Sequence, residues 1–215
     1  MDTYGGIVWF LEIVGTVAFA SSGAMVGIRK NMDIFGVNVL GLVTALGGGL
    51  IRDLILGITP PNMFRDPSYA LTAVVTSCVL FIVIYFRKNL LNSRHMRRYE
   101  QVMVVMDTIG LSTFTVIGID VAVGASFGDS RFLLVFLGAI TGVGGGMIRD
   151  VLAGETPYVL VRHVYACASL AGAILCVALR RPLGNGTAML AGAFLTGVVR
   201  WLAVKKNWNL PKIYK

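Results

Sequence analysis

The sequence contains one fourteen-residue motif twice, as Gly-Gly-Gly-Leu-Ile-Arg-Asp-Leu-Ile-Leu-Gly-Ile-Thr-Pro at 47–60 and as Gly-Gly-Gly-Met-Ile-Arg-Asp-Val-Leu-Ala-Gly-Glu-Thr-Pro at 144–157. Nine of the fourteen positions are identical, and the copies are 97 residues apart. Such a motif is unfavourable in an ordinary helix, because each Gly costs about 1 kcal/mol relative to Ala and the two charges resist burial. Its repetition indicates that the fold is organised around it.

The composition predicts an integral membrane protein. Of the 215 residues, 56% are hydrophobic and 14% are charged, and the mean hydropathy is +0.76. A soluble domain typically carries about 25% charged residues. The net charge of +8 does not indicate a nucleic-acid partner, because the basic residues lie in connectors and at the C-terminus, where membrane topology alone would place them. We therefore expect the lipid bilayer, and no nucleic acid, as a partner.

Seven segments are long and apolar enough to cross a membrane, which requires about 20 residues each. The connectors between them are short, so we expect one all-α membrane domain over 1–215 with seven transmembrane helices. The expected spans are 6–27, 34–57, 68–86, 101–122, 131–153, 158–179 and 186–204.

The distribution of basic residues predicts the orientation. With seven spans, one side collects Arg29, Lys30, Arg87, Lys88, Arg94, Arg97, Arg98, Arg162, Lys205, Lys206, Lys212 and Lys215, and the other collects Arg65, Arg131, Arg180 and Arg181. The positive-inside rule places the richer side in the cytoplasm. We expect the N-terminus outside and the C-terminus in the cytoplasm, in a prokaryotic cell membrane.

The repeat extends beyond the motif. At an offset of 95, Glu12, Gly15, Phe19 and Gly23 match Asp107, Gly110, Phe114 and Gly118, and Arg65 matches Arg162 at 97. We therefore expect repeat one at about 6–86 and repeat two at about 101–179. Three spans per repeat force the second copy to insert upside down, and inverted repeats place substrate and ion sites near the midplane on interrupted helices. The seventh helix, 186–204, has no counterpart, and its small residues indicate a packing role.

The glycine triplets, Gly47, Gly48, Gly49 and Gly144, Gly145, Gly146, lie near the middle of spans 2 and 5. A break in a membrane helix is tolerated only where protein or water satisfies the freed backbone groups. Two triplets at mirrored positions favour kinks that open onto an aqueous path. The alternative is that these glycines let helices approach closely.

Polar residues within the spans are further candidates for a pore or gate. Ionisable residues inside a membrane indicate function by default, and carboxylates attract cations. Arg52 and Arg149 could contact carbonyls freed at a kink or pair with an aspartate of the facing repeat, or they could only anchor the helix at the interface. Hydroxyl groups could replace part of an ion's hydration shell, or bond back to their own helix. The candidates are Arg52, Asp53, Arg149, Asp150, Thr44, Thr141, Glu12, Asp107, Ser21, Ser22 and Ser112.

We expect no catalytic residues, no metal site and no cofactor. His95 and His163 lie in or next to connectors without a partner at metal-ligand spacing, and no hydrolase, zinc-protease, P-loop or dinucleotide motif occurs. The sequence therefore argues against an enzyme.

The doubled motif, each copy ending in Thr-Pro inside a seven-span chain, resembles the prokaryotic trimeric intracellular cation channel family, which overlaps the glycine-transporter-domain membrane proteins. The resemblance covers nearly the whole chain. It implies a homotrimer with a pore through each protomer, lined by spans 2 and 5 bent at their glycines, and permeant K+ and Na+. The lysine motif with which animal members bind lipid is not evident, so lipid regulation is not implied.

Two other functions fit the residues themselves. A secondary transporter of glycine or another small solute could use the same helix interruptions as a binding site. A non-conducting structural or assembly protein would use the glycines only for packing.

Overall fold

The computed structural model describes residues 3–87, 93–161, 164–206 and 208. Several residues discussed above, namely Lys88, Arg162, His163, Lys212 and Lys215, lie outside the described residues, as do the side chains of Arg94 and His95.

The described chain is all helical, with seven helices long and apolar enough to cross a membrane. They are α1 (Thr3–Arg29), α2 (Ile34–Ile55), α4 (Ser68–Phe86), α5 (Ser93–Ala122), α6 (Arg131–Leu152), α8 (Tyr165–Leu183) and α9 (Asn185–Lys205). Two short helices, α3 (Asn62–Arg65) and α7 (Tyr158–Val161), precede α4 and α8, and a π-helical turn, η2 (Val123–Phe127), continues α5. The chain is a multi-pass membrane protein, as its composition predicts.

The observed bounds depart from the expected spans in the second half. Helix α5 begins at Ser93 rather than at 101. The expected span 158–179 is divided, because its first residues form the separate helix α7, and α8 begins only at Tyr165. Helix α8 also includes Arg180 and Arg181, which were expected in a connector, and ends one residue after Pro182.

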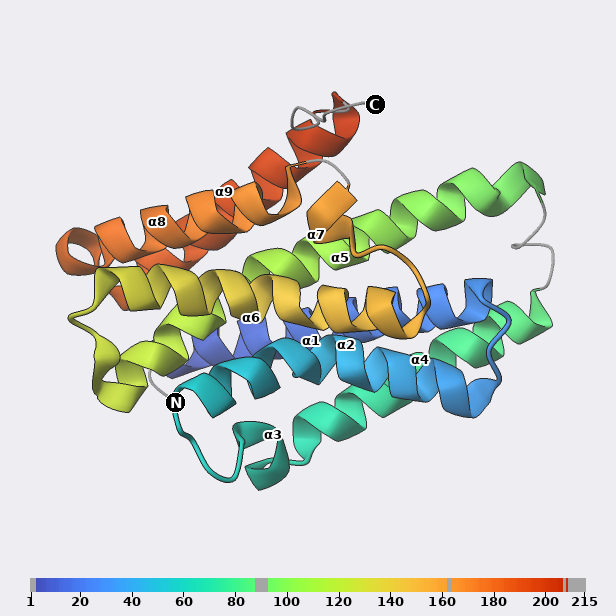
Figure 1. The fold of residues 1–215 in the computed structure, drawn as a ribbon, viewed down its shortest axis with the longest axis horizontal. Coiled ribbons are helices and arrows are strands. Elements are labelled where there is room, and N and C mark those ends of the chain that lie inside the picture. Colours follow the sequence, from blue (N-terminus) through green and yellow to red (C-terminus); the bar gives the residue numbers. More distant parts are fainter. Residues whose placement is uncertain (1–2, 88–92, 162–163, 207, 209–215) are drawn as a thin grey trace.

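The two halves of the chain form inverted repeats. Helix α4 packs against α1 and α2, and α8 packs in the same way against α5 and α6. In Figure 1, α1 and α5 run in opposite directions along the long axis, as do α2 and α6. The predicted pair of inverted three-helix units is therefore confirmed.

Equivalent residues of the two repeats meet at the centre of the molecule. The rings of Phe19 and Phe114 are in contact, with centroids 5.4 Å apart. Each ring packs where the other repeat has a glycine: a Cβ atom at Gly110 would lie 2.0 Å from Phe19, and one at Gly15 would lie 3.2 Å from Phe114. Contacts between equivalent positions show that a pseudo-two-fold axis passes between α1 and α5.

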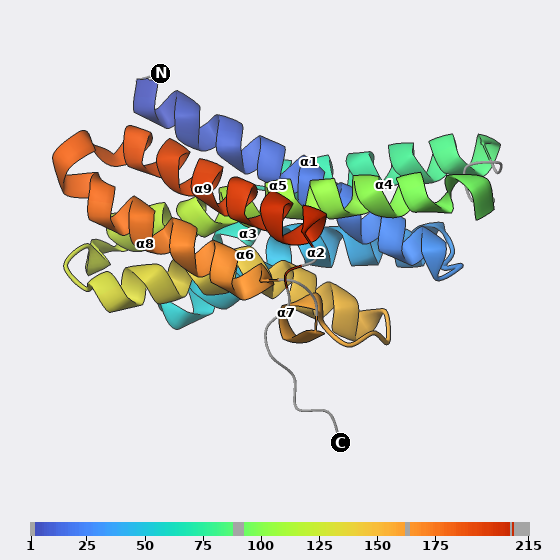
Figure 2. The ribbon, with the colours of Figure 1, turned by 90° about the horizontal axis from the view of Figure 1, so that it is seen from above.

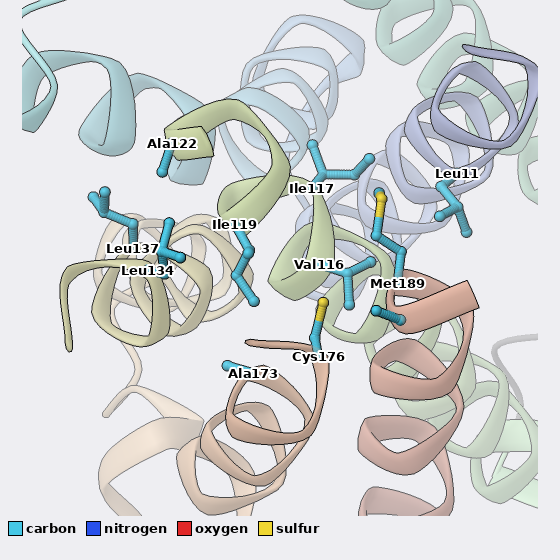
Figure 3. Close-up of a cluster of buried hydrophobic side chains, with 11 residues drawn as sticks. Leu11, Val116, Ile117, Ile119, Ala122, Leu134, Leu137, Ala173, Cys176 and Met189 are labelled. Carbon is cyan, nitrogen blue, oxygen red and sulfur yellow. The ribbon is translucent and has the colours of Figure 1, made fainter. Parts of the chain in front are cut away.

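The seventh helix, α9, is attached to both repeats. It packs mainly on α8 and α5, with a smaller contact to α1 (Figure 2). A buried apolar cluster joins these helices at the end of the molecule near η2 (Figure 3). It includes Leu11, Val116, Ile117, Ile119, Ala122, Leu134, Leu137, Ala173, Cys176, Ala188 and Met189. The small residues of α9 that sequence analysis assigned to packing, Ala188, Gly192 and Thr196, are all buried.

Candidate functional site: two buried arginine–carboxylate clusters

The fourth glycine of each motif copy ends its helix. Gly57 and Gly154 have φ values of 69° and 67°, a left-handed conformation that glycine adopts most readily. The residue after each glycine donates its N–H back to an aspartate carbonyl, Ile58 to Asp53 and Glu155 to Asp150, both at 2.9 Å. This is the bond pattern of a glycine-terminated helix.

The aspartate of each Arg-Asp pair then fixes the short helix that follows. Asp53 Oδ2 accepts a hydrogen bond from the Asn62 N–H, and Asp150 Oδ2 accepts one from the Tyr158 N–H, both at 2.8 Å. These N–H groups lie at the first turns of α3 and α7, where a carboxylate also interacts favourably with the helix dipole. The motif therefore connects the end of one helix to the start of the next in both repeats.

Each arginine pairs with its own neighbouring aspartate, and among the described residues neither pairs with an aspartate of the facing repeat. Arg52 Nε and Nη2 lie 2.9 and 2.8 Å from Asp53 Oδ1, and Arg149 Nε lies 2.8 Å from Asp150 Oδ1. Arg52 is 6% exposed and Arg149 is 1% exposed. The structure therefore contradicts the interpretation of these residues as interfacial anchors that extend their charges into water.

Helices α2 and α6 are continuous through their glycine triplets, so the interruption of the backbone expected there is not observed. The triplets instead bring the two helices together. A Cβ atom at Gly48 would lie 2.1 Å from the Thr141 carbonyl oxygen, and one at Gly145 would lie 2.0 Å from the Thr44 carbonyl oxygen. The opposite helix leaves no space for a side chain at the middle position of each triplet. Close contact between α2 and α6 therefore explains why this position is glycine.

Most of the candidate hydroxyl groups bond within their own helices. Thr44 and Thr141 donate to the carbonyls of Leu40 and Leu137, both at 2.6 Å, and Ser112 donates to Thr108 at 2.8 Å. Ser21 is buried in α1.

The second repeat holds a dense cluster around Arg149. Its Nη1 atom donates to Asp107 Oδ1 and to Ser22 Oγ, both at 2.6 Å, and its guanidinium lies 5.6 Å from the centre of the Tyr158 ring. Asp107 and Ser22 are almost completely buried. Since Ser22 belongs to α1 and the other groups to repeat two, this cluster joins the two repeats.

The first repeat holds the equivalent residues around a cavity of about 280 Å³. The Tyr69 hydroxyl donates to Glu12 Oε2, so Glu12 is held by α4 rather than by an arginine. Arg52 and Asp53 lie on the cavity wall with Gly49 and Phe114. This arrangement places a carboxylate and a guanidinium next to an internal space large enough for several water molecules.

The sequence profile of a family described as "Glycine transporter" matches residues 9–85 and 104–181, the two halves found above. The chain belongs to this family. Similar proteins are a UPF0126 membrane protein of Vibrio cholerae, 40% identical over 98% of this chain and 84% of the relative, and the UPF0126 inner membrane protein YadS of Escherichia coli K12, 39% identical over 95% of both chains.

Solved structures of TRIC cation channels are also similar to this member of the Glycine transporter family. A prokaryotic TRIC channel determined in 0.5 M KCl has a TM-score of 0.84 and 34% identity, over 95% of this chain and 98% of the channel. The trimeric intracellular cation channel orthologue from Rhodobacter sphaeroides has a TM-score of 0.82 and 32% identity, over 94% and 99%. These relatives are channels and not enzymes, and their similarity over almost the whole chain supports a cation channel.

The family's doubled motif does not produce two equal environments in this chain. A Cβ atom at Gly146 would lie 3.2 Å from the Tyr165 hydroxyl, 3.6 Å from Arg149 Nη2 and 3.8 Å from Asp107 Oδ1. At the equivalent Gly49 only the Arg52 guanidinium comes within 4 Å. The third glycine therefore faces a filled polar cluster in repeat two and an open cavity in repeat one.

Sequence reasoning missed three polar residues of these clusters in this Glycine transporter family member. Tyr69 holds Glu12, Tyr165 lies over Gly146, and Arg200 of α9 lies with its guanidinium 4.7 Å from the Tyr165 ring. An arginine inside an apolar span is by itself a reason to expect a functional role. Arg200 was not among the candidates because α9 has no counterpart in the repeats with which it could be compared. Among the described residues, no group of three His, Cys, Asp or Glu side chains forms a metal site.

Proposed function

We propose that this protein is a monovalent cation channel with a separate pore in each protomer. The observation that carries the proposal is the similarity to TRIC cation channels over 95% of this chain, with a TM-score of 0.84. The buried polar residues between the repeats agree with it, because membrane proteins place ionisable side chains along ion pathways.

The pathway begins in the cavity of repeat one. Glu12, Asp53 and Tyr69 supply oxygen atoms at its wall, and Glu12 is a carboxylate without a direct arginine partner. A K+ or Na+ ion entering from this end would meet a negative site before the centre of the membrane. From there the route continues between α1, α2, α5 and α6, which meet at the two repeats' glycines and phenylalanines.

In this proposal the narrowest part of the pathway is where Phe19 and Phe114 touch and where α2 crosses α6 at Gly48 and Gly145, because the two repeats are in closest contact there. Conduction requires these helices to separate or bend, and the glycine triplets are the positions where the smallest side chains permit it. In this proposal the triplets close the pore by packing and open it by bending. Arg52 and Arg149 then tune selectivity or gating from the two ends.

Assembly and the kind of membrane follow the relatives, and the orientation follows the distribution of basic residues. We propose a homotrimer, as the description of the Rhodobacter sphaeroides relative as a trimeric channel suggests. We place the protein in a prokaryotic cell membrane, since YadS is described as an inner membrane protein, with the N-terminus outside and the C-terminus in the cytoplasm.

The direct test is planar-bilayer recording of the purified protein in KCl and then in NaCl. We expect discrete unitary currents whose reversal potential in a salt gradient moves toward the equilibrium potential of the cation. Replacement of Gly47 and Gly49 by alanine, with Gly48 kept because a Cβ atom there would meet the Thr141 carbonyl, should stiffen α2 by about 1–2 kcal/mol and reduce open probability. Unchanged unitary currents in this variant would contradict gating by the triplets.

The second candidate is a secondary transporter of glycine, which the description of the family favours. Proteoliposome uptake separates the two functions. Saturable uptake of labelled glycine without unitary currents would establish a transporter. The absence of both activities would leave a structural or assembly role.

A further inference from the structure

Helix α9 contributes a third buried arginine that neither repeat contains. Arg200 is only 1% exposed, although it carries a charged guanidinium group and lies inside a membrane span. Its guanidinium packs on the Tyr165 ring at 4.7 Å, and its Nε and Nη1 atoms have no hydrogen-bond partner among the described residues. A buried arginine without a carboxylate bonded to it is costly and requires an explanation.

The groups around Arg200 are complementary to it. The Tyr165 hydroxyl lies close enough to the Asp107 carboxylate to interact with it, but neither this hydroxyl nor Asp107 Oδ2 makes a hydrogen bond of normal geometry in the described part of the chain. The largest electrostatic attraction on Arg200 comes from Asp107. Two N–H donors, one hydroxyl and one carboxylate oxygen that all lack partners are satisfied together if a water molecule bridges them. Arg200 is thus positioned to attract Asp107 through its charge.

The formal charges show what Arg200 changes. In repeat one, the cavity wall carries the carboxylates of Glu12, Asp53 and Asp66 and the guanidinium groups of Arg52 and Arg65, which leaves one negative charge. In repeat two, Asp107 and Asp150 face Arg149, which would also leave one negative charge. Arg200 adds a positive charge there, so the second cluster is neutral.

We propose that Arg200 is a specificity-determining residue that cancels the cation-attracting charge at Asp107 and leaves Glu12 as the one uncompensated carboxylate of the two equivalent sites. The inverted repeats alone would give a cation two matching negative sites, one from each end of the pore. Arg200 makes the pathway electrostatically one-sided. This inference rests on the proposed channel function and adds to it the source of the charge asymmetry.

The neighbours of Glu12 increase the difference between the two ends. Arg52 attracts Glu12, and Asp120 and Asp66 both act on it as additional negative charges. Asp107 is instead bonded to the Arg149 guanidinium at 2.6 Å and is also attracted by the Arg200 guanidinium. Since an uncompensated charge in a low-dielectric passage concentrates counter-ions, cations should accumulate at the Glu12 end and not at the Asp107 end.

The test is a charge series at the second cluster, measured as unitary K+ conductance and cation-over-anion permeability in low-salt planar bilayers. Arg200→Gln makes the cluster negative, Asp107→Asn makes it positive, and the double variant Arg200→Gln/Asp107→Asn restores neutrality. We expect Arg200→Gln to raise low-salt conductance by roughly two-fold or more and Asp107→Asn to lower it. The double variant should return toward the parent value.

Two controls separate charge from structure. Arg200→Lys conserves the charge and should conduct like the parent, whereas Arg97→Gln removes one exposed surface charge and should have a much smaller effect. All differences should shrink at about 1 M salt, where the Debye length is about 3 Å. If Arg200→Gln does not fold, Asp107→Asn and the double variant still differ by one charge at the second cluster, so their conductances still test the predicted order.

The outcomes distinguish this inference from the proposed function. If the parent protein gives no unitary cation current, the channel proposal fails first. If the parent conducts, and the Arg200→Gln, Asp107→Asn and double variants do not follow the order of charge, Arg200 has only a structural role and the inference is wrong.

Discussion

At the residue scale, the three glycines of a triplet have different surroundings. The middle glycines, Gly48 and Gly145, face a backbone carbonyl of the opposite repeat at 2.1 and 2.0 Å from a built Cβ atom. Gly49 faces only the end of a flexible arginine at 3.6 Å. A carbonyl in a helix cannot move aside without its helix, so the middle position allows the least change.

We therefore predict that Gly145→Ala destabilises the protein by about 1–3 kcal/mol, because α2 and α6 must separate to admit the methyl group. Gly49→Ala is the matched control and should be neutral or slightly stabilising, since alanine favours a helix by up to about 1 kcal/mol. Thermal unfolding in detergent measures both. Equal midpoints for the two variants would show that close packing does not explain the triplets.

A second residue-scale prediction concerns Glu12. Replacement by glutamine removes the half-buried carboxylate that Tyr69 holds at the wall of the repeat-one cavity, so low-salt cation conductance should fall by roughly two-fold or more. Tyr69→Phe removes the hydroxyl and keeps the carboxylate, so it should preserve most of the conductance. Glu100→Gln removes an exposed carboxylate and serves as the control. A conductance unaffected by Glu12→Gln would place the ion path elsewhere.

At the scale of elements, α8 and α9 form the tightest pair outside the two repeats' own contacts. A Cβ atom at Gly172 would lie 1.8 Å from Thr196 Oγ1 and 2.6 Å from the Gly192 carbonyl oxygen. This contact positions α9, and with it Arg200, against repeat two. The close approach needs small residues, because helix pairs in lipid gain their stability from backbone proximity and packing rather than from the hydrophobic effect.

Gly172→Ala should therefore displace α9 and destabilise the protein by about 1–3 kcal/mol. Gly186→Ala, where the nearest atom is a flexible methyl group of Ile7 at 3.3 Å, is the control. Thermal unfolding and the accessibility of a probe at the α8–α9 contact check the result. An unfolding midpoint for Gly172→Ala equal to that of the control would mean that the two helices adjust without loss.

At the scale of the whole molecule, one ion-pair group links the end of α1 to the segment after α6. Glu155 lies 2.8 Å from Arg29 and 3.0 Å from Lys30. Repeat one has Ile58 at the equivalent position of the motif, so this link is present in only one half. The ion pairs of Glu155 and the packing of Arg200 on Tyr165 therefore give the second repeat charged contacts that the equivalent positions of the first repeat lack.

This link predicts a pH dependence of stability. Partial burial alone would raise the pKa of Glu155, but the hydrogen bond from Lys30 and the charges of Arg29 and Lys30 outweigh it and lower the pKa. A lowered pKa means that the ion pairs stabilise the folded protein above the unfolded-state pKa of about 4.3 and that this contribution is lost as the pH falls below it. Glu155→Gln should lower the unfolding midpoint at pH 7 and have little effect below about pH 4. A difference between the variants that is constant over this range would contradict the prediction.

The sequence by itself determined the membrane class, the seven spans, the inverted repeats and most of the buried polar residues. A membrane span is recognised from the hydropathy of about 20 consecutive residues, and the repeat is recognised from the constant offset between the two motif copies. Neither feature needs tertiary information. The sequence also predicted an interrupted helix at each triplet, because several glycines together are unfavourable within one helix.

The tertiary structure decided what those residues contact. It placed Gly48 and Gly145 against each other's helices with the backbone intact, paired Arg149 with Asp107, and left Glu12 beside a cavity with Tyr69. It also placed Arg200, from the helix without a repeat partner, next to one cluster and not the other. Periodicity within a helix cannot specify these contacts, because they depend on how distant helices pack across the pseudo-two-fold axis. The physical reason for the asymmetry is that a single seventh helix can pack against only one of two equivalent sites.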